Sequence, residues 1–147
     1  MYRHILVPID GSRVSELAAE AGIGLGKALG ARVTAVHVVP EPPASPLEAW
    51  AHRGANYSRE LGRSLESRAV LFLETIRETA LKAGVICECH LLHGESPHRE
   101  IIRAAENYDC DLIVMGSHRL NAEPGVLLDG ETIKVLTKGP IPVLVHH

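Results

Sequence analysis

The chain has 147 residues, 46% of them hydrophobic, and a formal net charge of −3 at pH 7, which predicts one domain with a substantial core over residues 1–147. The 15 basic residues are scattered, so the basic patch of a nucleic-acid-binding protein is missing. Apolar runs are too short for a membrane span and the N-terminus lacks a secretory signal pattern, so we expect no membrane contact and a cytoplasmic location.

Strand and helix patterns alternate along the chain. Short apolar runs without alternation are typical of strands covered on both faces, whereas apolar residues about 3.6 positions apart indicate amphipathic helices. The pattern predicts strands at residues 4–9, 32–39, 85–92, 112–115 and 141–145, and helices at residues 14–29, 56–83, from 97 onward and 130–137. The predicted fold class is therefore α/β, an open parallel sheet with helices on both faces and right-handed crossovers.

Glycine and proline mark several of the boundaries. Gly30 and Gly84 follow the first two helices as C-caps. Ser96 is the expected N-cap of the third helix and Pro97 its first residue, an arrangement in which serine satisfies free amides and proline presets φ. The proline-bearing residues 40–46 cannot continue a central strand, because proline lacks an amide donor, and we expect a surface loop there.

Two of the predicted strands end in polar turns that contain glycine. The first ends at Asp10-Gly11-Ser12, and the fourth ends at Gly116 with Ser117 behind it. Ligands of open parallel sheets bind beyond the carboxyl ends of the strands, so the sequence predicts a site at these turns. Together, the segments ILVPIDGS, HGESP, DLIVMGSH and KVLTKGPIPVLV are similar, in this order over nearly the whole chain, to the universal stress protein family.

The resemblance implies a Rossmann-like, adenine nucleotide alpha hydrolase-like sheet with the strand order 3-2-1-4-5. It also implies an adenine-nucleotide crevice, in which Asp10 and Val38 match the positions at the adenine end, and Met115 and Gly94 line the wall. An aspartate beside Gly11 can equally be a turn former that caps the first helix, and this alternative stays open.

The loop after the fourth strand departs from the family pattern. In ATP-binding members it reads Gly, two residues, Gly, nine residues, then Gly followed by Ser or Thr, which lets backbone amides approach phosphates. Here Gly116 matches the first glycine, Arg119 and Asp129 replace the other two, and Gly130 replaces the hydroxyl residue. With one inserted residue, Gly130 becomes the third glycine and Glu131 replaces the hydroxyl residue. Both registers bring a carboxylate to the phosphate position, where we expect it to oppose triphosphate binding.

Two functions follow from these residues. The first is a non-enzymatic stress-response or regulatory protein that acts as a homodimer and through an unknown protein partner, with weak or no ATP binding and no cofactor. The second is a nucleotide-binding switch or slow ATP hydrolase, in which Arg119 and magnesium restore the site for ATP or AMP. Dimerisation, as in similar family members, would use the last strand from Ile141 to Val145; the alternative is a monomer whose edge Pro140 and Pro142 protect.

Other groups of residues give weaker evidence of a binding or catalytic site. Gly22, Gly24 and Gly26 lie inside the first helix, so their spacing indicates close helix packing and not a dinucleotide fingerprint. Cys87 and Cys89 share a face of the third strand, and without a second ligand pair at matching spacing we expect core cysteines, as for Cys110, and no metal site. A catalytic motif is likewise missing.

Overall fold

The computed structural model describes residues 1–41, 55–117 and 130–147. Strands and helices alternate in this part of the chain, as the sequence predicts. In chain order the elements are β1 (His4–Ile9), α1 (Arg13–Leu29), β2 (Arg32–Val39), α3 (Ala55–Ala83), β3 (Cys87–His93), α4 (Pro97–Asn107), β4 (Leu112–Gly116), α5 (Gly130–Lys138) and β5 (Val143–His146). Among the helices that the structure describes, none is long and apolar enough to cross a membrane.

Two strands begin later than predicted, in both cases because of the residues in front of them. The amide of Val85 donates to the carbonyl of Ala80, 2.9 Å away, so Val85 completes the C-terminal cap of α3, where Gly84 has a φ of 75°. The last strand starts at Val143 and not at Ile141, and Pro142 directly before it has no amide to donate. Both shifts are of two residues or fewer and leave the topology unchanged.

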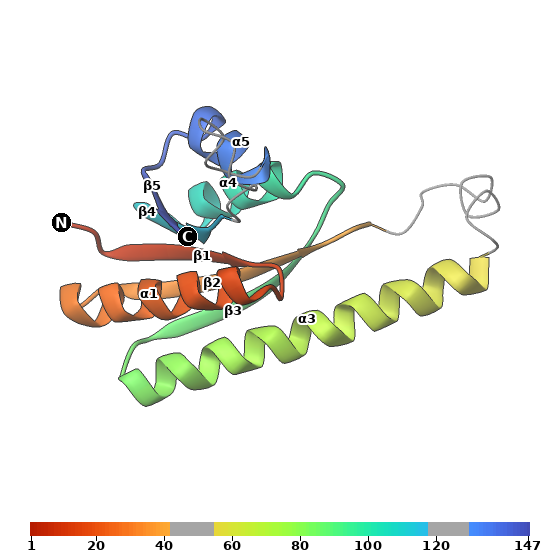
Figure 1. The fold of residues 1–147 in the computed structure, drawn as a ribbon, viewed down its shortest axis with the longest axis horizontal. Helices are drawn as coiled ribbons and strands as arrows, with labels where there is room; N and C mark the ends of the chain where they lie inside the picture. Colours follow the sequence, from red (N-terminus) through yellow and green to blue (C-terminus); the bar gives the residue numbers. More distant parts are fainter. Residues whose placement is uncertain (42–54, 118–129) are drawn as a thin grey trace.

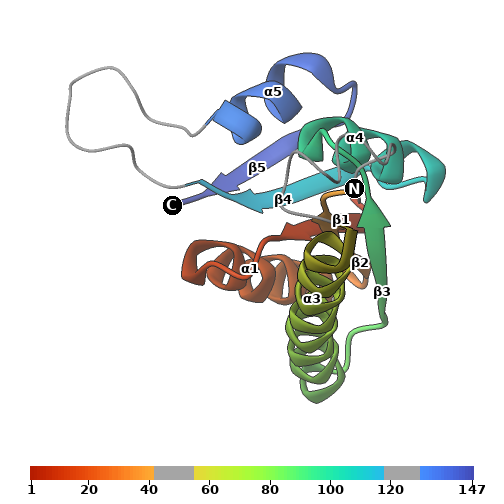
Figure 2. The ribbon, with the colours of Figure 1, turned by 90° about the vertical axis from the view of Figure 1, so that its right-hand side faces the viewer.

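The strands form one parallel sheet with the order β3-β2-β1-β4-β5, which confirms the predicted order. Helices α1 and α3 cover one face of the sheet and α4 and α5 the other (Figures 1 and 2). The chain runs outward from β1 in one direction through β2 and β3, then returns to place β4 and β5 on the other side. The topological switch point of the sheet therefore lies between β1 and β4.

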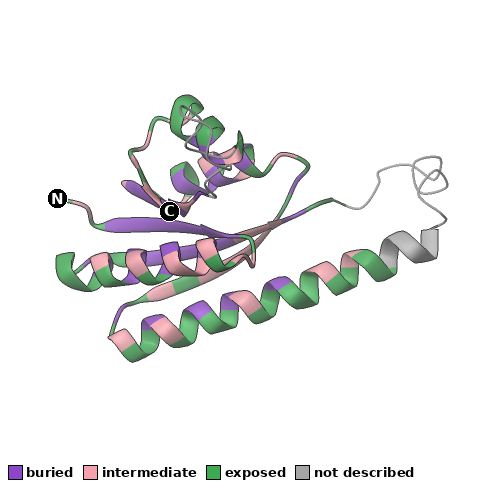
Figure 3. Ribbon diagram, in the orientation of Figure 1, coloured by how far each residue is buried: buried purple, intermediate pink, exposed green. Residues whose placement is uncertain are grey.

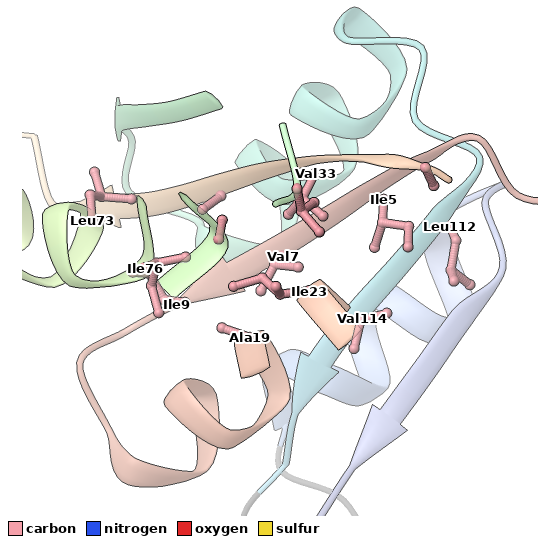
Figure 4. Packing of buried hydrophobic residues seen from close by; sticks show 14 residues of the cluster. Ile5, Val7, Ile9, Ala19, Ile23, Val33, Leu73, Ile76, Leu112 and Val114 are labelled. Atoms are coloured by element: carbon pink, nitrogen blue, oxygen red, sulfur yellow. The ribbon is translucent and has the colours of Figure 1, made fainter. Parts of the chain in front are cut away.

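The core consists of two apolar layers, one on each side of the central strand β1. Ile5, Val7 and Ile9 pack into the layer under α1 and α3, whereas Leu6 packs into the layer under α4 and α5. Figure 4 shows the first of these layers, and Figure 3 shows how burial concentrates on the strands while the outer helix faces stay exposed. Successive side chains of a strand point to opposite faces, so two covered faces require an apolar residue at every position.

The glycines of α1 let the helix approach the sheet closely at two of three positions. A Cβ on Gly22 would lie 2.8 Å from Cγ2 of Val7, and one on Gly26 would lie 3.1 Å from Cγ2 of Val33. At Gly24 nothing lies within 4 Å. The prediction of close helix packing is confirmed for Gly22 and Gly26 and is wrong for Gly24, which faces open space.

Candidate functional site

A cavity of about 180 Å³ lies at the carboxyl ends of β1 and β4. These two strands are paired near their beginnings, at Ile5 with Leu112 and at Leu6 with Ile113. The cavity opens where their carboxyl ends separate, at the switch point of the sheet, which is where open α/β sheets bind ligands. This is the place that the two glycine-bearing turns predict.

The cavity has mainly apolar walls and a few polar groups at its edge. Five residues that the sequence predicts for the site line it together: Asp10, Val38, Met115, Gly116 and Glu131. The sequence does not point to the remaining wall residues, which include Pro97 and Ile101 of α4. No local pattern could place them there, because the position of α4 depends on how the helix packs across the sheet.

Of the other three predicted residues, the structure describes Gly130 alone, and Gly130 is not among the residues that line this cavity. Gly130 is the exposed first residue of α5, and nothing within 4 Å would meet a Cβ there. Arg119 and Asp129 lie outside the described residues. Gly94 is not among the lining residues of the described part of the cavity, and a Cβ there would meet the side chain of Glu100, so this glycine makes room for α4.

The turn after β1 shows what Asp10 does locally. Its Oδ1 accepts a hydrogen bond of 2.8 Å from the amide of Ser12, which is an Asx turn, and its own amide donates to Oγ of Ser15 at 3.2 Å. The cap of α1 is Ser12, whose Oγ accepts from the amide of Ser15 at 3.2 Å. Asp10 is therefore the turn former of the alternative stated above, but it is not the helix cap, and its exposed side chain also lines the cavity.

Gly116 ends β4 against the first turn of α1. A Cβ at this position would lie 2.7 Å from both Cγ1 and the carbonyl oxygen of Val14. The strand can therefore end beside the helix only without a side chain there. Oγ1 of Thr132 donates to the carbonyl of Gly116 at 3.3 Å, which ties the first turn of α5 to the same strand end.

A carboxylate of α5 occupies the N-terminus of α4 at the edge of the cavity. Oε2 of Glu131 accepts a 2.9 Å hydrogen bond from the amide of His98 and lies 3.1 Å from Nδ1 of the same residue. Oε1 of Glu131 accepts a 2.9 Å bond from Nζ of Lys134. A negative charge is stabilised at this end of a helix, because free amides and the helix dipole both favour it.

This contact corrects the expectation for Ser96. Ser96 is the N-cap residue and Pro97 begins the helix, as predicted, but the Ser96 side chain makes no capping hydrogen bond to the backbone. Its Oγ instead lies 3.2 Å from Nδ1 of His98. Glu131, from a helix that follows 33 residues later in the sequence, satisfies the free amide in its place.

The same contacts keep Glu131 charged. Partial burial alone would raise the pKa of its carboxyl group, but hydrogen bonds from Lys134 and from the backbone and ring of His98 outweigh burial and lower that pKa. The carboxylate of Asp10 lines the same cavity. The crevice thus combines an apolar interior with two carboxyl groups at its edge, a setting that suits a neutral or weakly charged ring system better than a polyanion.

Such a cavity at the switch point of a Rossmann-like sheet defines the class of protein: an α/β protein with a candidate small-molecule crevice at the strand ends. The model of the universal stress protein family matches residues 1–147, and the chain belongs to this family. A universal stress protein of Methanocaldococcus jannaschii is 33% identical over 146 residues, which is 99% of this chain and 82% of the relative.

Solved structures agree with this fold. The universal stress protein UspA from Lactobacillus plantarum has a TM-score of 0.82 at 22% identity, covering 99% of this chain and 98% of that one. A universal stress protein solved in complex with cAMP has a TM-score of 0.73 at 22% identity, covering 99% and 97% of the two chains. One from Archaeoglobus fulgidus, solved in complex with dAMP, has a TM-score of 0.69 at 21% identity, covering 99% and 98%.

Proposed function

We propose that this universal stress protein is a non-enzymatic stress-response or regulatory protein that acts as a homodimer. Its crevice takes a nucleoside or an adenine nucleotide with a single phosphate, and binds ATP weakly or not at all. The observation that carries this proposal is the Glu131 carboxylate, held in the crevice by the amide of His98.

The size and walls of the cavity favour a small ligand. A volume of about 180 Å³ is below the roughly 300–1,000 Å³ of typical ligand pockets, so the described residues surround part of a nucleotide, such as its base. The apolar walls suit a planar ring. Two relatives of the same fold were solved with cAMP and dAMP, each of which carries one phosphate.

Charge separates mononucleotides from triphosphates in this crevice. A phosphate oxygen about 4 Å from a carboxylate is opposed by about 1 kcal/mol in water and about 4 kcal/mol at an effective dielectric near 20. The electrostatic repulsion grows with each phosphate that must pass Glu131, whereas a neutral nucleoside is not repelled. Asp129, by sequence, would add a second negative charge at the start of α5.

The alternative is an ATP-binding switch or slow ATP hydrolase with magnesium. The pairing of Glu131 with Lys134 at 2.9 Å favours it, because this cation could turn to a phosphate while the carboxylate bound magnesium through water. Arg119 would supply a second cation from the loop before α5.

Calorimetry on nucleotide-free protein separates the two functions. We expect adenosine or AMP to bind more tightly than ATP with magnesium, and ADP formation from ATP to stay at the rate without protein. Tighter binding of ATP than of AMP would contradict the first proposal and support the switch. The double variant Asp129→Gly with Gly130→Ser, which restores the third glycine and the hydroxyl residue of the family pattern, should gain ATP affinity.

The homodimer is proposed from the edge of the sheet. β5 is the last strand in the order, and Leu144 at its centre is 41% exposed. Antiparallel pairing of β5 with its own copy across a two-fold axis would cover the edge, since such isologous contacts close by symmetry. Analytical ultracentrifugation tests this directly. The cytoplasmic location and the protein partner stay predictions.

A further inference from the structure

A buried histidine lies next to the carboxylate that borders the crevice. His98, in the first turn of α4, is 7% exposed. Its Nδ1 lies 3.1 Å from Oε2 of Glu131 and 3.2 Å from Oγ of Ser96. Glu131 lines the cavity, so only this carboxylate separates the imidazole from a ligand at that wall.

These contacts determine which ring nitrogen carries the proton in the neutral imidazole. Glu131 stays ionised, because its hydrogen bonds lower the pKa of its carboxyl group, and an ionised carboxylate can only accept hydrogen bonds. Nδ1 of His98 therefore donates to Oε2, and the hydroxyl of Ser96 can accept from the same N–H. Nε2 is then the unprotonated nitrogen, and it is the atom that takes up a second proton.

Proton uptake at Nε2 changes the charge at the edge of the crevice. While the imidazole is neutral, the carboxylate of Glu131 and the ammonium group of Lys134, 2.9 Å apart, balance each other. Once the ring is an imidazolium, the same carboxylate lies between two cations. Imidazole is the side chain that ordinarily changes charge between about pH 5 and 8. A phosphate near Glu131 should therefore be repelled less under mildly acidic conditions.

The elements that pack against α4 bring few other charges to the ring of His98. These elements are α5 and β2. The charged groups of α5 at this place are Glu131 and Lys134. On the same side of the sheet, β2 presents Val36 and Val38, which do not titrate.

The remaining charged groups around the start of α4 point elsewhere or lie across the cavity. Glu95 and Arg99, on either side of the first turn, are exposed. Glu100 lies 3.6 Å from Arg103, one turn farther along the helix. Asp10, at the end of β1, lines the same cavity and is the other carboxylate that a ligand would meet.

We propose that His98 couples the binding of a phosphate in the crevice to the uptake of a proton at its Nε2. This inference rests on the proposed function of a crevice for nucleosides and single-phosphate nucleotides. Because the ring acts beside Glu131, His98 is a positioning residue. A phosphate about 4 Å from Oε2 of Glu131 lies within about 7 Å of Nδ1. Partly screened by water, a positive charge at that distance tightens binding by about three- to tenfold.

Cyclic AMP is the probe that isolates the charge of the protein, because its own single negative charge stays constant in this pH range. Calorimetry should show about three- to tenfold tighter binding of cAMP at about pH 5.5 than at about pH 8. Adenosine, which is uncharged there, should change by less than about twofold. In two buffers of different ionisation enthalpy, cAMP should take up a fraction of a proton and adenosine none.

A matched pair of histidine variants assigns the proton. His98→Asn keeps an N–H donor close to the position of Nδ1 but cannot titrate, so it should bind cAMP equally well at both pH values. His90→Asn is the control. His90 stacks on Tyr108, the C-cap of α4, with 4.6 Å between the ring centroids. It lies at the other end of this helix and should keep the full pH dependence.

Two results would overturn the coupling while the crevice stands. One is binding of cAMP by the unmodified protein with the same affinity at both pH values, a measurement that needs no variant. The other is a pH dependence that persists in His98→Asn, which would assign the proton to another group such as Asp10. If neither cAMP nor adenosine binds at any pH, the proposed function is wrong and the coupling falls with it.

Discussion

The charge on Glu131 should be the main obstacle to ATP in this crevice, and the substitution Glu131→Gln removes it with little change of shape. The amide oxygen of glutamine can still accept the 2.9 Å hydrogen bond from the amide of His98. The ion pair with Lys134 is lost, which leaves that cation available to a phosphate. The variant therefore changes the electrostatics of the site more than its geometry.

The size of the effect follows from the position of the carboxylate. Its side chain is 40% exposed, so water screens it and the interaction with a phosphate about 4 Å away lies in the lower half of the ~1–4 kcal/mol range. We expect the repulsion between Glu131 and a phosphate to be about 1–2 kcal/mol, so its removal corresponds to a roughly 5- to 30-fold gain in ATP affinity. Loss of the charge at the N-terminus of α4 should also cost about 0.3–1 kcal/mol of stability.

Calorimetry with ATP and with adenosine separates the electrostatic effect from a general change in the crevice. ATP binding should strengthen as stated, adenosine binding should stay within about twofold, and the melting temperature should fall by a few degrees. Glu106→Gln is the matched control, since Glu106 is an exposed carboxylate roughly 12 Å farther along α4 by the helix rise. Equal gains for ATP and adenosine, or no gain for ATP, would refute the reasoning.

Three further predictions concern the scaffold. Gly22→Ala places a Cβ 2.8 Å from a methyl of Val7 and should lower the free energy of unfolding by about 1–3 kcal/mol. Gly24→Ala, with nothing within 4 Å of the new Cβ, should raise it by up to ~1 kcal/mol. If urea unfolding shows that the two substitutions change the free energy of unfolding in the same direction, this packing is wrong. Burial alone would raise the pKa of Asp111, but amides at the start of β1 donate to its carboxylate at 2.9–3.1 Å and lower the pKa below 3.8. Because this pKa is lower in the folded chain, its contribution is present at neutral pH and disappears as the pH falls from the unfolded value through the folded one. Asp111→Asn should therefore cost about 1 kcal/mol at pH 7 and flatten the acid limb of the stability profile, and an unchanged acid limb would contradict this role. Leu144→Asp should convert the proposed dimer into a monomer in ultracentrifugation without loss of fold, and a persistent dimer would move the interface elsewhere.

Much of the fold could be predicted because it depends on local patterns. The run from Ile5 to Ile9 is apolar at each position since both faces of β1 are covered, and this predicts a central strand of a parallel sheet. Gly30 has a φ of 66°, as expected of a helix C-cap. The place of the crevice was also predictable, because the carboxyl ends of parallel strands meet at one edge of the sheet.

The boundaries that sequence reasoning missed depend on hydrogen bonds and not on hydrophobic periodicity. Val85 continues the apolar pattern of a strand, yet its amide closes the end of α3. Ser96 has the residue type of a capping side chain, yet a more distant carboxylate takes the amide. A residue type states what a side chain can do, while the partners that compete for each donor are set by the packed chain.

The sequence by itself determined the alternation of strands and helices, the family, and the edge of the sheet at which a ligand would bind, because these follow from periodicity and from motifs within a few residues. Only the tertiary structure decided that Glu131 caps α4 through His98, 33 residues away, and that the thiol of Cys89 of β3 donates to the carbonyl of Leu73 of α3. Such contacts join elements that are distant in the chain, and their geometry depends on how helices pack across the sheet. The charge of the crevice is therefore a property of the packed molecule.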